Sequence, residues 1–353
     1  MVFKINKSVI SKKNNTYFIA DIAANHDGNI DKAIELINIA KQSGANAAKF
    51  QHFHADTIVS RHSFERMKKL AHQSKWKKSV YQVYKEASLS LNWTRKLYNE
   101  CKKINIDFFT SPYSIELVDH VDRFVSAYKI GSGDITYSEI IEYIAKKKKP
   151  VILSTGASSI TEVERATKII KKFNKNICIM QCNTNYTDSK ENFNYINLNV
   201  LTLFKERFKD VILGLSDHTP GHSTVLGAVA LGARIIEKHF TLSNKSVGPD
   251  HKFSMTPNTW KEMVERTREL ELAMGSKKKL LEKNEKDSVI VQRRSVHLNK
   301  RYKKNEKIKI KDVSCLRPSP HGSVQPYELK KIKSRFLKVN KEKGDILYWK
   351  DLK

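Results

Sequence analysis

The chain has 353 residues, of which 40% are hydrophobic, and carries a formal net charge of +28 at pH 7. This length suits one large α/β domain with a small appendix, and no run of 18 or more apolar residues is available to span a membrane. Although the charge would suit nucleic acid, the lysines are spread along the whole chain, so we expect a lysine-rich surface without a nucleic-acid partner.

Eight short apolar runs alternate with segments of helical periodicity, as in 30–40, where the apolar residues share one face. Eight such alternations predict a TIM (β/α)8 barrel. The alternative is an open doubly wound sheet, but that fold usually has fewer strands, and neither a G-x-G-x-x-G nor a Walker A motif is present. The predicted strands are 17–23, 45–51, 106–111, 127–131, 151–156, 177–183, 211–217 and 234–240.

The second connection, 52–104, is much longer than the others. It carries Trp76, Tyr81, Tyr84 and Trp93 in helix-like alternation with polar residues. We therefore expect an extra helix near the barrel mouth, before the regular barrel helix. Long connections of this kind often act as lids or substrate walls.

The pattern changes after Gly275. A lysine- and glutamate-rich stretch without apolar periodicity predicts a linker at 276–290. Short strand-like pieces separated by turns then predict a small β-rich domain at 291–353, which leaves 1–275 for the barrel. The expected strand-like pieces are 293–298, 308–310 and 346–348.

The amino terminus and the cysteines indicate the compartment. Residues 1–6 contain no apolar leader segment. Cys101, Cys178, Cys182 and Cys315 lack the spacing of a zinc finger or a disulfide framework. We expect a reduced, cytoplasmic protein.

Two neighbouring predicted strands, 211–217 and 234–240, each deliver a histidine to the same edge, namely His218 and His239. Because parallel strands lie about 5 Å apart, both imidazoles would reach one divalent cation, and two protein ligands would leave positions open for substrate. The alternative is that each is an ordinary polar residue at a strand end. The expected surroundings of the metal are Ser216, Asp217, Glu237 and Lys238.

Every predicted strand ends in polar residues, at the carboxyl edge where TIM barrels place their chemistry. Lys49 and Lys129 would form a phosphate and carboxylate cradle. The three carboxylates Asp21, Asp134 and Asp250 would manage protons or hold hydroxyls. A single Ser or Thr at such a place would more simply be a turn residue, but four occur together. The expected hydroxyl groups of the cradle are those of Thr110, Ser132, Ser154 and Ser216.

These motifs make the chain resemble the sialic acid synthase family from about residue 17 to the carboxyl terminus. The tail resembles the family's antifreeze-like (SAF) domain, with 316–318 matching its arginine motif. The matching motifs are 23–28 (AANHDG), 49–51 (KFQ), 109–112 (FTSP), 128–133 (YKIGSG), 153–156 (LSTG), 214–219 (GLSDHT), 237–240 (EKHF) and 248–250 (GPD).

The resemblance implies condensation of phosphoenolpyruvate with an N-acylated aminosugar, such as N-acetylmannosamine, to a nine-carbon sialic-type acid with release of phosphate. It implies a divalent metal, manganese before magnesium or cobalt, held by His218 and His239 to activate the sugar aldehyde. It also implies a domain-swapped homodimer in which Arg317 reaches the partner's site and binds the N-acyl group.

Residue by residue, the resemblance assigns two substrate sites. Asp21 and Asp134 stand where the family commonly has Glu, and 182–187 also departs from the common pattern. The resemblance therefore does not identify which sugar is the substrate. A legionaminic or pseudaminic precursor is one alternative, and a metal-dependent aldolase or hydrolase on the same barrel is another. Phosphoenolpyruvate is assigned to Lys49, Thr110, Lys129, Ser132, Ser154 and Ser216, and the sugar to Gln51, Asn183, Tyr186, Asp250 and Arg317.

Overall fold

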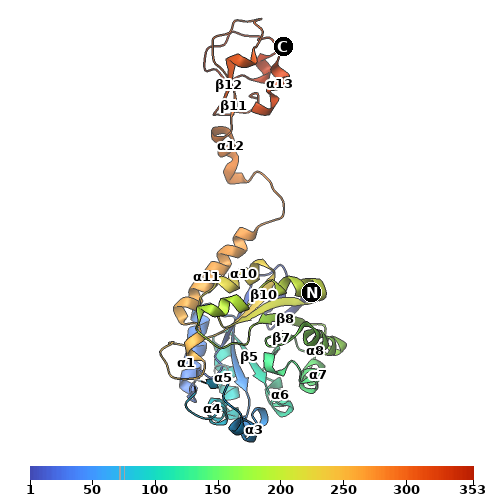
Figure 1. Cartoon of the computed structure of the whole chain (residues 1–353), viewed down its shortest axis with the longest axis vertical. Helices are drawn as coiled ribbons and strands as arrows, with labels where there is room; N and C mark the ends of the chain where they lie inside the picture. The colour runs from blue at the N-terminus through green and yellow to red at the C-terminus, as the bar shows by residue number, and fades with distance from the viewer. Residues whose placement is uncertain (71–72, 75) are drawn as a thin grey trace. The chain divides into compact units, whose positions relative to one another are not determined.

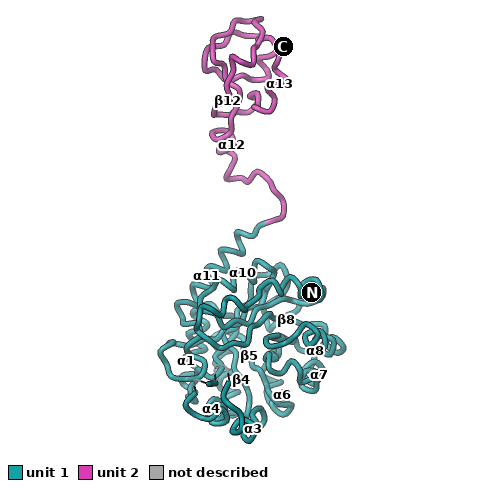
Figure 2. Tube along the Cα trace, in the orientation of Figure 1, with its two compact units in different colours: residues 1–275 teal, residues 276–353 magenta. Residues whose placement is uncertain are grey.

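The computed structural model describes residues 1–70, 73–74 and 76–353. The chain forms two compact units, Met1–Gly275 and Ser276–Lys353 (Figure 2).

Unit 1 is a nearly closed barrel of eight parallel strands surrounded by helices (Figure 1), which confirms the predicted TIM fold. The hydrogen-bonded order is β5-β4-β3-β10-β9-β8-β7-β6, and β5 and β6, at its two ends, lie side by side. The strands are β3 (Tyr17–Asp21), β4 (Ala47–His52), β5 (Asp107–Pro112), β6 (Tyr128–Ile130), β7 (Val151–Ser154), β8 (Ile177–Cys182), β9 (Ile212–Asp217) and β10 (Ala233–His239).

A helix follows each strand and buries one apolar face against the barrel. In the helix after β7, a capping box of Ser159 and Glu162 starts the first turn, and Val163, Ala166 and Ile170 are buried one turn apart. The barrel helices are α1 (Ile30–Gln42), α5 (Thr94–Lys103), α6 (Ile115–Asp122), α7 (Ser138–Lys146), α8 (Ile160–Phe173), α9 (Val200–Arg207), α10 (Ser223–Ala230) and α11 (Pro257–Met274).

Side chains of the barrel strands alternate between the barrel interior and the layer under the helices. In β3, Tyr17 and Ile19 pack inside, whereas Phe18 and Ala20 pack outward. An amino-terminal hairpin, β1 (Val2–Ile5) and β2 (Ser8–Ser11), adds three buried apolar side chains to the interior cluster. The interior is therefore apolar below its carboxyl edge, and these hairpin side chains are Phe3, Ile5 and Ile10.

The described part of the long connection between β4 and α5 holds three short α-helices where one was expected. They are α2 (Ala55–Ile58), α3 (Arg61–Arg66) and α4 (Val80–Ala87). The physical reason for the division is that Ser60 and Ser79 each cap a new helix with their side chains. Residues 71, 72 and 75 of this connection lie outside the described residues.

Unit 2 contains a two-stranded antiparallel sheet, β11 (Ser295–Leu298) and β12 (Val313–Leu316), around a small apolar core. The expected strand at 308–310 is wrong: β12 begins at Val313, five residues after the expected start, and a 3-10 turn precedes it, although Ile308 is buried in the core. The expected linker 276–290 also differs, because it includes the start of α12 (Lys286–Gln292). The other helix of this unit is α13 (Leu329–Ile332).

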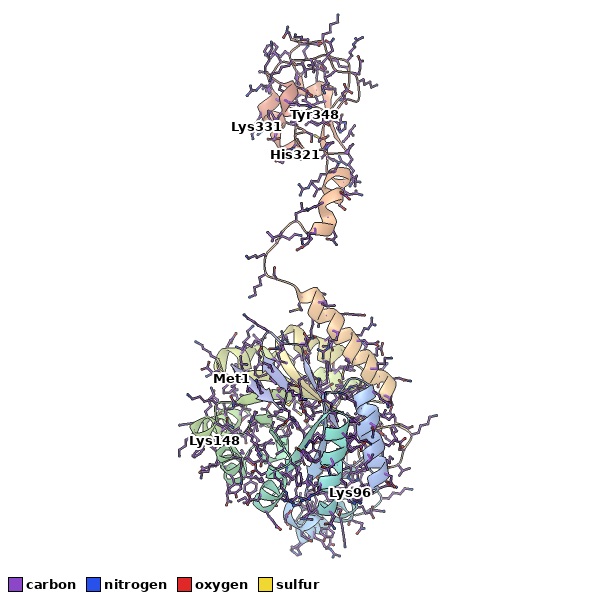
Figure 3. All side chains as sticks on the ribbon, turned by 180° about the vertical axis from the view of Figure 1, so that it is seen from behind. Met1, Lys96, Lys148, His321, Lys331 and Tyr348 are labelled. Atoms are coloured by element: carbon purple, nitrogen blue, oxygen red, sulfur yellow. The ribbon has the colours of Figure 1, made fainter. Side chains whose placement is uncertain are left out.

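The lysines cover the surfaces of both units. Lys96 and Lys148 of unit 1 and Lys331 of unit 2 are exposed and extend away from the ribbon (Figure 3). Among the described residues, no helix is long and apolar enough to cross a membrane.

Candidate active site

The carboxyl ends of the barrel strands surround a small polar cavity of about 40 Å³, which we call the anion cavity. Its strand residues face inward and lie above the apolar interior. Residues from different strands that would be far apart in an extended chain therefore meet around one cavity. The lining residues are Asp21, Lys49, Gln51, Ser111, Tyr113, Lys129, Gly131, Ser132, Ser154, Cys182, Tyr186, Ser216, His218, Glu237 and His239.

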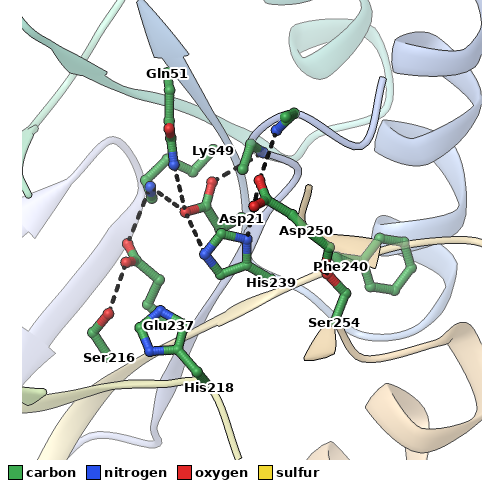
Figure 4. Close-up of polar contacts among 12 residues, drawn as sticks. Asp21, Lys49, Gln51, Ser216, His218, Glu237, His239, Phe240, Asp250 and Ser254 are labelled. Carbon is green, nitrogen blue, oxygen red and sulfur yellow. Dashed lines mark hydrogen bonds and ion pairs between the residues drawn. The ribbon is translucent and has the colours of Figure 1, made fainter. Parts of the chain in front are cut away.

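Two lysines and two carboxylates form a buried network in this cavity, which we call the inner cluster. Figure 4 shows its Lys49, Asp21 and Glu237. Lys49 Nζ lies 2.5 Å from Asp21 Oδ2 and 3.8 Å from Glu237 Oε2, and Lys129 Nζ lies 3.2 Å from Glu237 Oε1. Burial alone would lower the pKa of Lys49, but Asp21 and Glu237 outweigh burial and raise it. The lysine therefore stays charged inside the barrel.

The pKa values of the two carboxyl groups in the inner cluster are shifted in opposite directions. Burial raises the pKa of Glu237, but Lys129 and Lys49 outweigh burial and leave this pKa below its usual value. The pKa of Asp21 is instead raised, because burial and the nearby Glu237 exceed the attraction of Lys49. Glu237 is thus a fixed anion that orients both ammonium groups.

Serine hydroxyls complete the anion cavity. Ser216 Oγ donates to Glu237 Oε1 at 3.1 Å, and Ser132 Oγ accepts from the Gly156 backbone N–H at 2.9 Å. A Cβ at Gly156 would stand 1.9 Å from Thr184 Oγ1, so only glycine permits this close approach. The buried hydroxyl of Ser111 has no hydrogen-bond partner, and this group is available to a ligand.

The two predicted histidine ligands lie side by side at the ends of adjacent strands, with their ring planes tilted by 47°. The ring centroids of His218 and His239 are 5.3 Å apart. His218 Nδ1 donates to the Asn183 carbonyl oxygen at 2.9 Å, which leaves the Nε2 lone pair unused. Figure 4 shows the His239 ring between Asp21 and Asp250, with nitrogen–oxygen distances of 3.7 and 3.9 Å.

Both rings have the properties of metal ligands. Burial lowers the pKa of His218 to about 4, helped by His239, and lowers the pKa of His239 to about 3, helped by Lys49. Both imidazoles are therefore neutral at pH 7, and His239 Nδ1 is buried without a hydrogen-bond partner. No group of three or more His, Cys, Asp or Glu side chains that could hold a metal ion occurs among the described residues. The two neutral imidazoles alone fit a cation that takes two protein ligands and leaves its other positions open.

A second cavity, of about 110 Å³, adjoins the first and shares Gln51, Tyr186 and His239 with it. We call it the distal cavity. Burial raises the pKa of Asp250, which lines it, to about 7, although the Ala24 backbone N–H donates to its carboxylate at 3.2 Å. The distal cavity is lined by Ala24, Gln51, Phe53, Trp76, Val83, Tyr84, Ala87, Tyr186, His239, Pro249 and Asp250.

The structure does not bring the Thr110 side chain into the anion cavity. Its hydroxyl lies 2.6 Å from His52 Nδ1, outside the barrel, and the other ring nitrogen of His52 contacts the Thr94 hydroxyl at 2.9 Å. The physical reason is strand alternation: Phe109 fills the barrel interior, so Thr110 faces outward and Ser111 faces inward. Ser111 therefore takes the place expected for Thr110.

Asp217 and Lys238 were expected around the metal, and this expectation is wrong for the same reason. Each follows an inward-facing residue and points outward, where the two form a buried ion pair that we call the outer pair. Asp217 also accepts from the hydroxyls of Thr219 and Thr224 at 2.8 Å each, and Lys238 Nζ donates to the Thr219 carbonyl oxygen at 2.6 Å.

Three other predicted site residues lie elsewhere. The side-chain amide of Asn183 donates to the Tyr195 carbonyl oxygen at 3.2 Å. Asn183 contacts the site with its backbone carbonyl oxygen, which accepts the hydrogen bond from His218. Asp134 follows β6 in a 3-10 turn and lines neither cavity, although burial raises its pKa to about 6. Arg317 belongs to unit 2, where its Nε donates to the Gln292 carbonyl oxygen at 2.7 Å.

Sequence reasoning missed several lining residues. Ser111 and Cys182 follow from strand alternation, because each lies two residues after an inward-facing apolar residue. Phe53, Val83 and Ala87 carry no such signal, because they lie in the long connection after β4.

Two buried lysines and a histidine pair at the carboxyl ends of the strands of a TIM barrel are typical of a barrel enzyme that acts on an anionic substrate. The chain belongs to the NeuB family: the NeuB family model matches residues 36–279, and the SAF domain model matches residues 293–353. Unit 2 therefore contains a SAF domain, of which the small sheet is a part. The protein is a synthase of this enzyme family.

Characterised relatives and solved structures agree with this assignment. The chain is 36% identical over 320 residues to the N,N'-diacetyllegionaminic acid synthase of Campylobacter jejuni, covering 89% of this chain and 93% of that protein. It is 34% identical over 307 residues to the pseudaminic acid synthase of the same organism, covering 86% and 87%. The crystal structure of N-acetylneuraminic acid synthetase from Leptospira borgpetersenii, with citrate, matches with a TM-score of 0.72 and 26% identity, covering 82% of this chain and 95% of that one.

Proposed function

We propose that this enzyme condenses phosphoenolpyruvate with an N-acylated aminosugar to give a nonulosonic acid and inorganic phosphate. The observation that carries the proposal is the anion cavity: two buried lysines held by carboxylates stand directly beside two neutral histidines. The products named for the two Campylobacter relatives are nonulosonic acids. The identities to these two relatives, 36% and 34%, are too similar to indicate which of their two sugars this enzyme uses.

In this proposal, phosphoenolpyruvate occupies the anion cavity. Lys49 and Lys129 pair with its phosphate and carboxylate groups, and the unpaired Ser111 hydroxyl gains a partner. Since the inner cluster is already ordered in the free enzyme, the cations need not reorganise when charge moves onto the departing phosphate. The other hydroxyls that line this cavity are those of Ser132, Ser154 and Ser216.

The sugar aldehyde would lie at the histidine pair. His218 and His239 would hold a divalent cation, manganese before magnesium or cobalt, and a bound cation would polarise the aldehyde oxygen. C3 of the enol would attack the aldehyde carbon, water would add at C2, and the resulting tetrahedral carbon would release phosphate. Gln51, Tyr186 and Asp250 line the path from the histidines into the distal cavity and would hold the sugar.

Asp250 is suited to exchange protons near neutral pH, because burial raises its pKa to about 7. One oxygen of Asp21, Oδ2, accepts two hydrogen bonds: one from Lys49 Nζ at 2.5 Å and one from the Gln51 amide at 3.3 Å. It thereby links the phosphate-binding lysine to the sugar-binding amide.

A direct assay tests the function. Purified enzyme is mixed with phosphoenolpyruvate, manganese and a panel of aminosugars, phosphate release is measured, and the product mass is determined. We expect release only when both substrates are present, with a product that contains the sugar plus three carbons. Absence of release with every sugar of the panel would contradict the proposal, and turnover of an aldol or ester substrate without phosphoenolpyruvate would favour the aldolase or hydrolase alternative.

We further propose a domain-swapped homodimer in which the SAF domain's Arg317 binds the N-acyl group in the partner's site. Support comes from the SAF match and from the exposure of Arg317 on unit 2. Arg317→Ala should raise the KM for the sugar about 10-fold and leave the KM for phosphoenolpyruvate unchanged, as expected for the loss of one charge-assisted hydrogen bond. Unchanged kinetics, or a monomer by light scattering, would remove this role.

A further inference from the structure

The barrel has one junction between neighbouring strands that no ladder of hydrogen bonds closes. β5 and β6 stand at the two ends of the hydrogen-bonded order, although they lie side by side, and both strands are described in full. We call this junction the seam. Both strands carry side chains of the anion cavity, namely Ser111 on β5 and Lys129 on β6. The spacing of these two groups therefore depends on contacts other than a shared ladder.

A third cavity, of about 690 Å³, lies at the amino ends of the same two strands, and we call it the seam cavity. Asp107, the first residue of β5, and Ser126, two residues before β6, both line it. Of its described lining residues, none is shared with the anion cavity or the distal cavity. At ~3.3 Å per strand residue, Ser111 and Lys129 lie roughly 10–13 Å further along the strands. Pockets of this volume are typical of sites for small ligands.

Aromatic rings form one part of the lining. The ring centroid of Tyr98 lies 5.5 Å from that of Phe124 and 6.3 Å from that of Phe108, and all three residues line the seam cavity. The guanidinium carbon of Arg123 lies 4.8 Å from the centroid of the Phe124 ring. A planar ligand ring would gain aromatic contacts here, next to a cation.

Cationic side chains surround the same space. Lys7, Lys102 and Arg123 line it, are exposed, and have no ion-pair partner among the described residues. Lys41 also lines it, and its Nζ donates to the Asn105 carbonyl oxygen at 2.7 Å. Three cations without a carboxylate partner favour an anionic ligand.

The carboxylate of the lining is already bonded, whereas a hydroxyl is not. Asp107 Oδ1 accepts from the Asn6 side-chain amide at 2.6 Å, and Oδ2 accepts from the Tyr17 hydroxyl. The hydroxyl of Ser126 is buried without a hydrogen-bond partner. A phosphate alone would leave the rings unused, and an uncharged ring would leave the cations unused. A planar ring that carries a phosphate uses both.

We propose that the seam cavity binds a nucleoside monophosphate and that this ligand tightens the binding of phosphoenolpyruvate across the seam. The phosphate pairs with Arg123 and Lys102, and the base packs against Tyr98. The ligand bridges two strands that no ladder joins, and it thereby holds Ser111 and Lys129 at one spacing. The binding is independent of the proposed function, whereas the coupling to phosphoenolpyruvate rests on it.

Calorimetry with the full-length enzyme, without phosphoenolpyruvate or sugar, tests the site. The probes are AMP, GMP, CMP and UMP, with inorganic phosphate and the free nucleosides as controls. We expect at least one monophosphate to bind once per chain, and phosphate and its nucleoside to bind at least about 10-fold more weakly, because each lacks half of the contacts. No binding by any of the four monophosphates, or equal affinity for inorganic phosphate, would overturn the site.

A pair of arginine variants locates the binding. Arg123→Ala should weaken the monophosphate about 10-fold, as expected for the loss of one charge-assisted hydrogen bond. Arg207→Ala is the matched control, because Arg207 is also exposed, ends the barrel helix α9 and does not line the seam cavity. Equal affinities in the two variants would overturn the proposal, since a monophosphate bound by the lysines of the anion cavity does not depend on Arg123. Lys102→Ala repeats the test with a second cation of the lining.

The coupling is measured by titrating phosphoenolpyruvate with and without saturating monophosphate. The Kd of phosphoenolpyruvate should fall about 5-fold, and phosphoenolpyruvate should tighten the monophosphate by the same factor, because coupling between two sites is reciprocal. An unchanged or raised Kd would overturn the coupling. An enzyme that binds the monophosphate but neither binds nor consumes phosphoenolpyruvate would refute the proposed function and leave the seam site standing.

Discussion

The inner cluster and the outer pair are two buried charged groups that share one strand, β10. Successive residues of β10 supply them: Glu237 faces the barrel interior and Lys238 faces the helices. The outer pair is saturated, because the Asp217 carboxylate accepts two hydroxyl hydrogen bonds besides its lysine. The inner cluster is not, since Glu237 Oε2 is buried without a hydrogen bond.

The difference teaches how to separate structural from functional charge in this barrel. Both groups are almost completely buried, so burial alone does not distinguish them. The distinguishing feature is unused bonding capacity that faces a cavity, as at Ser111 Oγ and His239 Nδ1. Substitutions in the inner region should therefore impair activity, and those in the outer region should impair stability.

The largest effect is expected from the histidine pair. His218→Ala should lower kcat at least about 1,000-fold, because the sugar aldehyde would lose its electrophilic activation. Manganese affinity, measured by calorimetry, should fall with it, and the thermal unfolding midpoint should change little. Retained activity together with undiminished metal binding would contradict the ligand assignment.

Breaking the outer pair gives the opposite result. Lys238→Met leaves the Asp217 carboxylate buried without its cation and should lower the free energy of unfolding by about 3–5 kcal/mol. Activity per folded molecule should stay close to that of the wild type. Urea denaturation followed by an activity measurement at low temperature checks both statements, and a stable but inactive variant would show that Lys238 acts in the site.

A third prediction concerns His52, which is buried outside the barrel between two threonines. Burial, with a smaller contribution from His120 and His54, lowers its pKa to about 3 in the folded protein. Because this is below the unfolded value of about 6.5, the stabilisation is present above pH 6.5 and is lost as the pH falls toward 3. At pH 5 the loss should be about 2 kcal/mol.

Urea denaturation of His52→Gln between pH 7 and pH 5 measures this contribution. In His52→Gln, the free energy of unfolding should depend less on pH than in the wild type, whereas His321→Gln, at an exposed position of unit 2, should keep the wild-type pH dependence. If the free energy of unfolding of His52→Gln falls with pH as steeply as that of the wild type, His52 is not the group responsible.

The smallest effects compare two adjacent residues. Ser111→Ala should raise the KM for phosphoenolpyruvate by a few-fold to about 10-fold, because one hydrogen bond to the anion is lost, and should not change stability. Thr110→Val should leave that KM unchanged and lower the free energy of unfolding by about 1 kcal/mol through the bond to His52. If Thr110→Val raises the KM for phosphoenolpyruvate and Ser111→Ala leaves it unchanged, Thr110 is the substrate ligand after all.

The barrel was predictable from the sequence because its signal is local and repeated. Each strand is a short apolar run, and each barrel helix has one apolar face, so eight units could be counted without knowing their arrangement. The histidine pair was predictable for the same reason, because His218 and His239 end consecutive strands of one β/α unit.

Which face each residue takes was decided by packing. A shift of one residue along a strand reverses the side of the sheet, and Phe109 inside the barrel turned Thr110 outward and Ser111 inward. Asp217 and Lys238 followed the same rule, since their neighbours face the cavity.

The eightfold barrel, the SAF tail, the set of polar strand ends and a long connection near the barrel mouth were therefore readable from the sequence, because these depend on patterns within short stretches. The folded structure was needed to show which polar groups share the cavity, which have their hydrogen bonds satisfied elsewhere, and which residues of the connection after β4 line the distal cavity. The physical reason is that cavity walls and pKa shifts arise from contacts between residues far apart in the chain.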